Sequence, residues 1–332
     1  METGKQPYLL VEDLEVIYTS GRKVIHAVNG VSFQVNRHQT LGLVGETGAG
    51  KTTIAKAILQ ILPEPPAKLR KGRIVLDNEN LLEKSKNEML DIRGKKVAMI
   101  FQDPMTALNP IQTVGDQIAE GVLLHNHCTR AEAAKRAEEM LEMVGIPGSR
   151  YAEYPFEFSG GMKQRVVIAM ALACNPELLL ADEPTTALDV TIQAQVLELI
   201  NELKEKYGTA MILITHDLGV VAQTCDMVAV VYAGQIVEYG TKADIFLHTA
   251  HPYTHGLFES LPKMEDIAKR LTPINGMPPD PTDLPEGCSF HPRCPHAIPA
   301  CRKNPAALKE VSPGHFCRCI RAGCKEEKEC LY

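Results

Sequence analysis

The sequence predicts an α/β fold built around a parallel β-sheet. Short apolar runs alternate with helical patterns along about 250 of the 332 residues. A glycine-rich loop separates one of these runs, QTLGLVG at 39–45, from the helical pattern KTTIAKAILQIL at 51–62. Alternation of strands with helices is typical of parallel sheets, because each parallel crossover needs a long connection that is usually a helix.

The expected elements follow one another in a regular order. Apolar runs bounded by turns predict strands at 8–18, 26–35, 39–45, 73–77, 96–102, 177–182 and 210–217, and then a hairpin at 228–240. The first helical pattern ends at the proline-rich PEPPA. Thr129 and Glu132 form the pattern of a capping box that opens a helix reaching 146, and a further helix is expected at 190–208.

The composition changes near residue 250. Pro, Cys, His and Gly become more frequent there, and the periodicity of apolar residues fades. We therefore expect one large domain over 1–250, with a helical subdomain at about 103–175, and a C-terminal extension over 251–332. Seven of the ten cysteines lie in this extension, and its Cys-rich segment spans 288–319.

Charge and hydropathy argue against two classes of protein. The formal net charge is −6 and the pI is about 6.0, whereas proteins that bind nucleic acid usually carry a basic face. The longest apolar runs, such as 227–233, fall short of the roughly 20 residues that span a bilayer. Acidic residues interrupt the N-terminal stretch where a signal peptide needs an apolar core. We expect no nucleic-acid partner, and a membrane role only through other subunits.

The loop from Gly45 to Thr52, GETGAGKT, matches the phosphate-binding pattern GxxxxGK[ST] in full. An apolar strand precedes it and a helix follows, which is the context that the pattern requires. Amides of such a loop turn toward phosphate oxygens, Lys51 would reach the β- and γ-phosphates, and Thr52 would bind Mg²⁺. The residues expected to contact the nucleotide here are Gly45, Glu46, Thr47, Gly48, Ala49, Gly50, Lys51, Thr52 and Thr53.

Two carboxylates follow the strand expected at 177–182. Asp182 ends this strand, where its carboxylate can hold the Mg²⁺ shell. Glu183 is placed to orient or deprotonate an attacking water. Together with the phosphate loop, these residues predict hydrolysis of a nucleoside triphosphate.

Further motifs resemble those of ABC-transporter ATPases. FSGGMKQR at 158–165 resembles the signature motif of that family, Gln102 its Q-loop, and 187–189 its D-loop. His216 resembles the switch histidine at the γ-phosphate, and Tyr18 the aromatic residue that stacks on adenine. The roles that the resemblance implies are catalysis for Glu183, His216 and Gln102, Mg²⁺ binding for Thr52, Gln102 and Asp182, and nucleotide contact for Tyr18, Ser159, Gly160, Gly161 and Asp189.

The resemblance also implies a fold and a partner. The fold would be a P-loop NTPase (RecA-like) core with an antiparallel β subdomain, a helical signature subdomain and a small C-terminal extension. Family members work as head-to-tail pairs, in which the phosphate loop of one subunit faces Ser159, Gly160 and Gly161 of the other. ATP closes such a dimer and hydrolysis reopens it. Because the chain carries one set of motifs, it needs a second ABC ATPase, identical or distinct.

A narrower resemblance is to the ATPase subunits of oligopeptide and dipeptide importers. FQDPMTALNPIQTVGDQI and ADEPTTALDVTIQAQ carry it, and HPYTHGL at 251–257 resembles the marker that opens the extension in this group. The signature departs from the commoner LSGGQ at Phe158 and Met162, a variant typical of one of the two peptide-importer ATPases. The resemblance implies ATP-driven uptake of di- or oligopeptides, with nickel or another small solute as the alternative cargo.

The implied partners are membrane proteins. They are two permease subunits and, indirectly, an extracytoplasmic substrate-binding protein, so we expect a peripheral subunit at the cytoplasmic face of the cell membrane. A coupling helix of a permease would dock at about 103–120. An apolar docking surface of Met105, Leu108 and Ile111 is a hypothesis, and packing in the core is the role favoured for these residues.

Two other classes of function fit less well. A soluble ABC ATPase of DNA repair or translation usually carries a coiled-coil insertion or two cassettes in one chain, and this sequence has neither. Its acidic balance also disfavours nucleic acid. A redox or metal sensor that nucleotide regulates would not need the complete set of motifs for ATP hydrolysis that this sequence carries.

The spacing of the cysteines in the extension favours a metal centre. Disulfides are disfavoured in a reducing cytosol. Zinc sites more often show CxxC pairs, whereas Cys288, Cys294 and Cys301 are separated by five and by six residues. Cys317 and Cys319 are separated by one residue, which is too tight for such a pair. Four thiolates on a proline-rich loop fit a [4Fe–4S] cluster, with Zn²⁺ and free thiols as the alternatives.

Some peptide-importer ATPases carry such a cluster on a similar tail, GCxFHPRCP followed by two more cysteines. The last of these follows a His-x-x-x-Cys pattern, which His315 and Cys319 match. The resemblance therefore implies ligation by Cys288, Cys294, Cys301 and Cys319, with Cys317 as the alternative fourth ligand. Cys324 and Cys330 are expected to be free thiols near the chain end. The expected cofactors are ATP, Mg²⁺ and a [4Fe–4S] cluster or Zn²⁺.

Overall fold

The computed structural model describes residues 6–185, 190–260 and 273–322. The chain divides into two compact units. The first unit comprises Met1–Tyr8, Val35–Thr40 and Asn80–Ile214, and the second comprises Leu9–Gln34, Leu41–Glu79 and Thr215–Tyr332. Within the described ranges, no helix combines the length and the apolar character that crossing a bilayer requires.

The second unit contains a mixed sheet that carries the phosphate loop. Its strands, in spatial order, are β11 (Lys309–Ser312), β12 (His315–Cys317), β10 (Gln235–Thr241), β9 (Met227–Tyr232) and β3 (Thr40–Val44). β3 pairs in parallel with β9, and β9 pairs antiparallel with β10. Every residue of β3 is buried. The loop that begins at Gly45 therefore leaves the carboxyl end of a core strand, where open α/β sheets bind their ligands.

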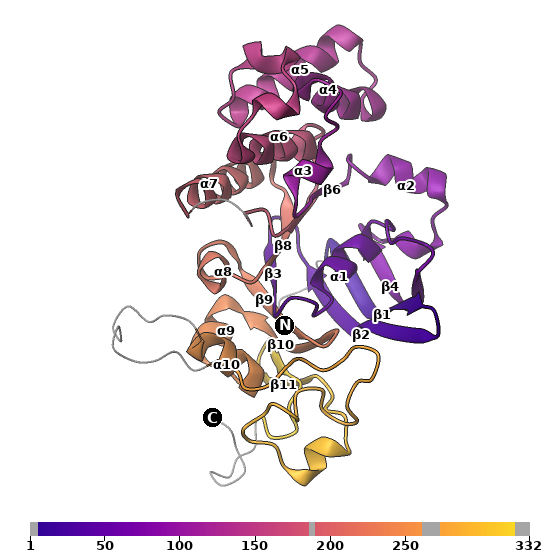
Figure 1. Ribbon diagram of the computed structural model, residues 1–332, viewed down its shortest axis with the longest axis vertical. Coiled ribbons are helices and arrows are strands. Elements are labelled where there is room, and N and C mark those ends of the chain that lie inside the picture. The colour runs from indigo at the N-terminus through magenta and orange to yellow at the C-terminus, as the bar shows by residue number, and fades with distance from the viewer. Residues whose placement is uncertain (1–5, 186–189, 261–272, 323–332) are drawn as a thin grey trace. The chain divides into compact units, whose positions relative to one another are not determined.

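A second sheet of this unit packs beside the first helix of the chain (Figure 1). Its spatial order is β2 (Lys23–Val35), β1 (Leu9–Ser20), β4 (Ala67–Leu76) and β5 (Glu79–Asn80). β1 pairs antiparallel with β4, and Leu9, Val11 and Val16 of β1 are fully buried. The helices of the unit are α1 (Lys51–Ile58), α8 (Leu218–Thr224), α9 (Lys242–Leu247), α10 (Pro252–Glu259) and the 3-10 helix η4 (Pro299–Arg302).

The first unit joins a parallel sheet to a group of helices. β6 (Val97–Ile100), β7 (Leu178–Asp182) and β8 (Ala210–Thr215) pair in parallel, and all their residues are buried. Continuous apolar runs, rather than alternation, suit such strands because both of their faces are covered. α4 (Val114–His125), α5 (Arg130–Met143) and α6 (Gly160–Leu172) pack on one another (Figure 1). The remaining elements are η1 (Leu81–Glu83), α2 (Lys86–Ile92), α3 (Pro104–Ala107), η2 (Gly148–Ala152), η3 (Pro155–Glu157) and α7 (Val190–Tyr207).

The predicted α/β class is confirmed, and each predicted strand is present. The capping box of Thr129 and Glu132 is also confirmed at the start of α5. α1 is shorter than predicted and ends at Ile58. Gln60 adopts a φ of 51°, and the amide of the next residue donates to the carbonyl of Lys56 at 3.0 Å. This left-handed turn closes the helix four residues before its apolar pattern ends.

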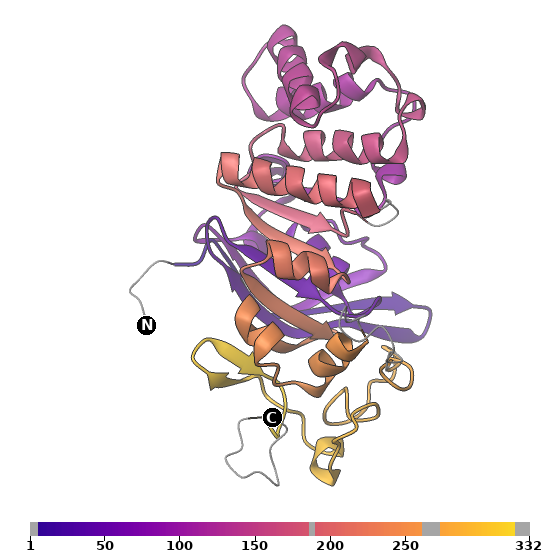
Figure 2. The same cartoon turned by 90° about the vertical axis from the view of Figure 1, so that its left-hand side faces the viewer.

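The extension contains strands that the sequence did not predict. β12 pairs antiparallel with β10, and β11 pairs antiparallel with β12, so the hairpin continues the sheet of the second unit (Figure 2). Cys317 lies opposite Glu238 in this pairing. Both strands are very short, and short strands carry too little alternation of apolar and polar residues to be recognised.

A buried carboxylate connects the extension to this sheet. Glu238 of β10 has no exposed surface, and its carboxylate accepts three hydrogen bonds. The amides of Ala250 and His251 donate at 2.7 Å and 3.1 Å, and Nε2 of His315 donates at 2.8 Å. The start of the extension and its last strand therefore share one acceptor, which satisfies the rule that buried charges are paired.

His251 makes the folding of this region sensitive to pH. Its Nδ1 accepts the amide proton of Tyr253 at 3.1 Å and so caps α10, which requires a neutral ring. Burial lowers the pKa of His251 to about 4, because the charged ring would lose its solvation. The unfolded chain, with an ordinary histidine pKa near ~6.5, binds a proton that the folded chain excludes between these values. This group therefore lowers the free energy of unfolding as the pH falls from 6.5 to 4, by up to about 3 kcal/mol.

We expect His251→Asn, which retains a capping oxygen without a titrating ring, to remove this part of the pH dependence. The measurement is the free energy of urea unfolding at pH 7 and at pH 4.5. His255→Asn changes another histidine of α10, a half-buried one, and serves as the control. Equal losses of stability in the native chain and in His251→Asn between the two pH values would contradict the assignment.

Candidate functional site

The phosphate loop, Gly45–Thr52, depends on glycine at two positions. Gly45 has a φ of 152° and Gly50 a φ of 101°, which side chains rarely allow. A Cβ atom on Gly45 would lie 2.1 Å from the carbonyl oxygen of Val231. One on Gly50 would lie 2.3 Å from the carbonyl oxygen of Ala27. The loop thus packs directly against neighbouring backbone, which leaves no space for a side chain there.

Lys51 is the first residue of α1 and is almost fully buried. Its ammonium donates to the carbonyl oxygens of Gly45 at 2.7 Å and Glu46 at 2.9 Å. The loop therefore encloses the cation that the sequence assigns to the phosphates. The N-cap of α1 is Gly50, so the first amides of the helix and the positive end of its dipole adjoin the loop.

The other predicted residues of the loop differ in exposure. Thr47 and Gly48 are exposed, whereas Ala49 is buried. Thr52 is half-buried. The hydroxyl of Tyr18, at the end of β1, lies 3.4 Å from the hydroxyl of Thr53. The second unit thus brings the predicted aromatic residue to the start of α1.

In the first unit, three predicted residues lie at the carboxyl ends of β6 and β7. Asp182, the last residue of β7, is only 2% exposed. Glu183 adopts a φ of 46°, and its amide donates to the carbonyl of Ile214 at 2.9 Å. Such a conformation costs energy for a residue with a side chain and persists where the surroundings hold it. The side-chain amide of Gln102 donates to the Glu183 carboxylate at 3.0 Å, so the sheet brings these two residues together.

His216 follows β8, is exposed and belongs to the second unit. Asp189, with the rest of the segment 187–189, lies outside the described residues.

The signature residues lie at the start of α6. Ser159 is the N-cap, and its hydroxyl accepts the amide proton of Met162 at 3.4 Å. Ser159 and Gly160 are exposed, and a Cβ atom on Gly160 would meet open space. One on Gly161 would lie 2.8 Å from Cγ2 of Ile192. This helix terminus therefore presents exposed amides and a favourable dipole to an anion.

Arg150, which sequence reasoning missed, contacts both residues in which the signature differs from LSGGQ. Its guanidinium lies 4.2 Å from the ring centroid of Phe158, and its Nη1 lies 3.5 Å from the sulfur of Met162. Nε donates to the carboxylate of Glu153 at 2.7 Å, which fixes the side chain. The signal in the sequence was that Phe158 and Met162 both differ from the residues of the commoner signature LSGGQ. Phe158 in particular provides a ring, on which an arginine can stack as it cannot on an aliphatic side chain.

The proposed apolar docking surface needs a correction at Leu108. Met105 is 61% exposed and Ile111 is 82% exposed, whereas Leu108 is only 6% exposed. Leu108 therefore packs in the core, the role favoured for all three residues, whereas the exposure of Met105 and Ile111 contradicts that role for them. Met105 and Ile111 remain available on the surface of the first unit.

The cysteines of the described extension lie close together in space. Each of the thiols of Cys288, Cys294, Cys301 and Cys319 is within electrostatic range of the other three. The amide of Cys288 donates to the carbonyl of Cys301 at 2.9 Å, which joins the two ends of the 288–301 segment. Cys317 is fully buried in β12, where its interactions extend to Cys288 and Cys319.

Backbone amides point at three of these sulfur atoms. The donors are Phe290 and His291 for Cys288, His296 for Cys294, and Arg321 and Ala322 for Cys319. Burial nevertheless raises the pKa of Cys294 to about 11, because a thiolate loses its solvation there. The thiol is therefore protonated at pH 7 unless a cation stabilises the thiolate.

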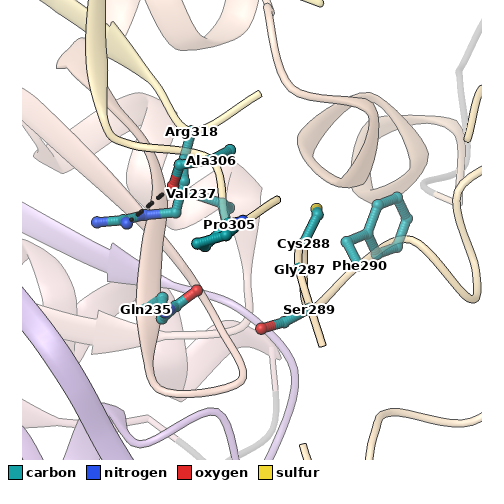
Figure 3. Close-up of a pocket in the computed structure, with 9 residues that line it drawn as sticks. All are labelled: Gln235, Val237, Gly287, Cys288, Ser289, Phe290, Pro305, Ala306 and Arg318. Atoms are coloured by element: carbon teal, nitrogen blue, oxygen red, sulfur yellow. Dashed lines mark hydrogen bonds between the residues drawn. The ribbon is translucent and has the colours of Figure 1, made fainter. Parts of the chain in front are cut away.

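The space beside Cys288 is too small for an organic ligand. Figure 3 shows its lining, in which Nη1 of Arg318 donates to the carbonyl of Ala306 at 3.2 Å. The cavity has a volume of about 10 Å³, roughly that of one water molecule. In the part of the chain that the structure describes, no three His, Cys, Asp or Glu side chains converge closely enough to hold one metal ion.

Two residues of the extension reach the phosphate loop, which sequence reasoning also missed. The guanidinium of Arg293 pairs with the carboxylate of Glu46, and the hydroxyl of Tyr253 accepts the amide proton of Glu46. Arg293 and Glu46 are 247 positions apart, so no local pattern predicts their contact. Tyr253 belongs to the HPYTHGL marker, in which His251 caps α10 and Pro252 opens it.

Comparison with family models matches two parts of the chain. Residues 28–186 match the model described as ABC transporter. Residues 237–301 match the model described as oligopeptide/dipeptide transporter, C-terminal region. The second match begins in β10, before the compositional change that we used as a boundary.

Curated relatives match along nearly the whole chain. A probable peptide ABC transporter ATP-binding protein of Sinorhizobium fredii is 51% identical over 315 residues, which cover 94% of each chain. The dipeptide transport ATP-binding protein of Bacillus subtilis is 49% identical over 313 residues, covering 94% of this chain and 93% of its own.

Solved structures show the same cassette fold. A dimeric ATP-binding cassette in a post-hydrolysis state with ADP and phosphate has a TM-score of 0.64 and 26% identity, covering 70% of this chain and 98% of its own. A subunit of an ABC transporter complex from Clostridium perfringens has a TM-score of 0.62 and 27% identity, and the match covers 73% of this chain and 91% of its own.

Phe158 should contribute to stability through its contact with Arg150. Phe158→Leu, which installs the commoner signature residue, is expected to lower the free energy of unfolding by about 1 kcal/mol, because the arginine loses an aromatic face. Phe156→Leu, at a 72% exposed neighbour, should change it by less than about 0.5 kcal/mol. Chemical denaturation measures both. If Phe158→Leu lowers the free energy of unfolding by as much in an Arg150→Ala background as in the native chain, stacking of Arg150 on Phe158 does not explain the loss.

Proposed function

This chain belongs to the family of ABC-transporter ATP-binding proteins, and from that membership we propose that it powers the import of di- or oligopeptides. ATP hydrolysis is the activity of the family. One observation carries the peptide assignment: relatives named for peptide transport match 94% of the chain, and the C-terminal region of such transporters matches at 237–301. Nickel or another small solute is the alternative cargo.

We propose that the phosphate loop binds the β- and γ-phosphates of ATP. The buried ammonium of Lys51 and the amides at the start of α1 supply positive charge there. The hydroxyl of Thr52 and the carboxylate of Asp182 are hard oxygen donors, which suit Mg²⁺, and Gln102 would add an amide oxygen. When bound, Mg²⁺ neutralises charge on the phosphates.

We assign the role of general base to Glu183. Its carboxylate is half-buried and is oriented by the amide of Gln102 at 3.0 Å, so it can accept a proton from a positioned water. The fixed backbone of Glu183 limits the motion of this carboxylate. His216 would contact the γ-phosphate, and Tyr18 would stack on adenine from its place beside Thr53.

The site would be completed by a second ATPase subunit. The exposed N-terminus of α6, with Ser159, Gly160 and Gly161, would meet the γ-phosphate held by that partner. The partner would be an identical or a distinct ABC ATPase, since both give two composite sites. The dimeric arrangement of the solved cassette relative supports this proposal.

Transport would require membrane subunits. We propose that the transporter contains two permeases, that one of them docks on the first unit, where Met105 and Ile111 expose apolar side chains, and that the chain sits peripherally at the cytoplasmic face of the membrane. An extracytoplasmic binding protein would deliver the peptide to the permeases. Closure of the ATPase dimer on ATP would then bias the permeases toward one of their two conformations.

We also propose that 1–250 forms the ATPase domain, with the helical subdomain at about 103–175, and that 251–332 forms the extension. The change of composition at 250 supports the boundary. The start of the C-terminal family match at 237 favours a boundary slightly earlier.

Glu183→Gln should abolish hydrolysis while leaving ATP binding intact. Loss of the base is expected to lower kcat for ATP by roughly 10²–10⁴-fold, and peptide uptake by the assembled transporter should fall with it. Glu177→Gln, at the opposite end of β7, is the matched control and should leave both rates unchanged. A normal kcat in Glu183→Gln would refute its role.

The cargo is tested by uptake into proteoliposomes that hold the complete transporter. Radiolabelled dipeptides, a hexapeptide and Ni²⁺ are supplied in turn with the binding protein. ATP-dependent accumulation of peptide supports the proposal, and accumulation of Ni²⁺ alone would replace it with the alternative cargo.

We propose that the cysteines of the extension hold a [4Fe–4S] cluster rather than one Zn²⁺. Four thiols, those of Cys288, Cys294, Cys301 and Cys319, interact pairwise without exception, and amides point at three of them. Sulfur ligands of a single Zn²⁺ lie about 3.8 Å apart, given Zn–S bonds of about 2.3 Å. Each thiolate of a cluster binds a different iron, so a wider spacing suits it. We therefore propose a cluster, with Zn²⁺ as the alternative and Cys317 as the alternative fourth ligand.

Protein purified without oxygen should contain about four iron and four sulfide per chain. Cys319→Ser and Cys301→Ser should remove most of the iron, whereas Cys317→Ser should retain it. Cys174→Ser, in the first unit, is the control and should keep the full content. Stoichiometric zinc without iron would favour the alternative, and loss of iron in Cys317→Ser but not in Cys319→Ser would exchange the fourth ligand.

A further inference from the structure

Glu46, the second residue of the phosphate loop, is held by the C-terminal extension through its side chain. Nη1 and Nη2 of Arg293 donate to its two carboxylate oxygens at 2.8 Å and 2.9 Å. The side chain of Arg293 is 5% exposed and that of Glu46 is 28% exposed. A bidentate, mostly buried pair of this kind fixes both direction and distance, which a surface ion pair does not.

The backbone of Glu46 is held as well. Its amide donates to the hydroxyl of Tyr253 at 3.0 Å. Tyr253 is fully buried, and its ring lies 4.5 Å from that of Tyr232 and 5.4 Å from that of Phe290, measured between centroids. The hydroxyl therefore projects from a rigid aromatic cluster, and it defines where the loop begins.

Through Glu46 the extension reaches the lysine of the loop. The carbonyl of Glu46 accepts a hydrogen bond from Nζ of Lys51 at 2.9 Å. The carboxylate, amide and carbonyl of one residue thus connect Arg293, Tyr253 and Lys51. A shift of Glu46 would move an acceptor that holds the Lys51 ammonium in place.

The extension also lines the space next to the loop. A cavity of about 170 Å³ lies between Thr47 and Gly48 on one side and Pro279 and Leu284 on the other. The amide of His26 donates to the carbonyl of Pro281 at 2.8 Å, which ties this proline-rich stretch to β2. The proline-rich stretch therefore follows the phosphate loop along its exposed part.

We propose that Arg293 is a positioning residue for ATP binding, which acts through Glu46 to hold the phosphate loop and Lys51 in their binding arrangement, with Tyr253 as the second support. Arg293 also neutralises a carboxylate that adjoins the site of a highly charged anion. Without its partner, the Glu46 carboxylate would repel the phosphates, and the loop would lose one of its two anchors. The extension is thus part of the nucleotide site.

Binding of MgATP by the full-length chain tests this proposal, and displacement of a fluorescent ATP analogue measures the Kd. Arg293→Gln should raise the Kd about tenfold, the equivalent of about 1.4 kcal/mol. Arg293→Lys should recover most of the affinity, because it keeps the charge and one donor at the carboxylate. Arg302→Gln alters an exposed arginine that also adjoins a cysteine of the segment, and should leave the Kd unchanged.

Tyr253→Phe provides a second variant that leaves the Cys-rich segment intact. It keeps the buried ring and removes only the hydroxyl, so the Kd should rise roughly threefold. Thermal melting of each variant is recorded in parallel. A folded Arg293→Gln protein whose Kd lies within twofold of the native value overturns the proposal. If Arg293→Gln does not fold, an unchanged Kd in Tyr253→Phe overturns it instead.

Discussion

The site depends on contact between the phosphate loop and neighbouring backbone with no side chain between them. Gly45 and Gly50 make this contact, at distances where a Cβ atom would collide with the carbonyls of Val231 and Ala27. The contact fixes the direction of the loop amides and brings its first two carbonyls within reach of Lys51. Binding of phosphate by the loop presupposes this rigid backbone, because amides recognise phosphate only when they converge.

The extension completes the second unit and is not a separate appendage. β12 adds to the sheet beside β10, the buried Glu238 joins residues from both ends of the extension, and Arg293 and Tyr253 reach Glu46. The marker HPYTHGL gains a physical meaning from this arrangement. Its histidine caps α10, its proline starts the helix, and its tyrosine holds the phosphate loop.

Local patterns predicted most of the fold and the candidate nucleotide residues. Continuous apolar runs identified β7 and β8, and the capping box of Thr129 identified the start of α5, because these signals lie within a few adjacent residues. The contact of Arg293 with Glu46 and the pairing of β12 could not be predicted, since they join segments far apart in the sequence. The Gln102–Glu183 contact is an intermediate case. Each residue belongs to a motif that the sequence shows, but their contact becomes visible only when the sheet places them side by side.

The order of synthesis gives the Arg293–Glu46 pair a further consequence. A ribosome makes Arg293 247 residues after Glu46, which takes about 12 to 50 s at about 5–20 residues per second. For most of that interval the phosphate loop has neither of its C-terminal anchors, because Tyr253 is made only 40 residues before Arg293. A chain cut short before α10 would contain every motif of the loop and lack the supports that hold it. The phosphate loop therefore receives these supports only after the extension has been translated.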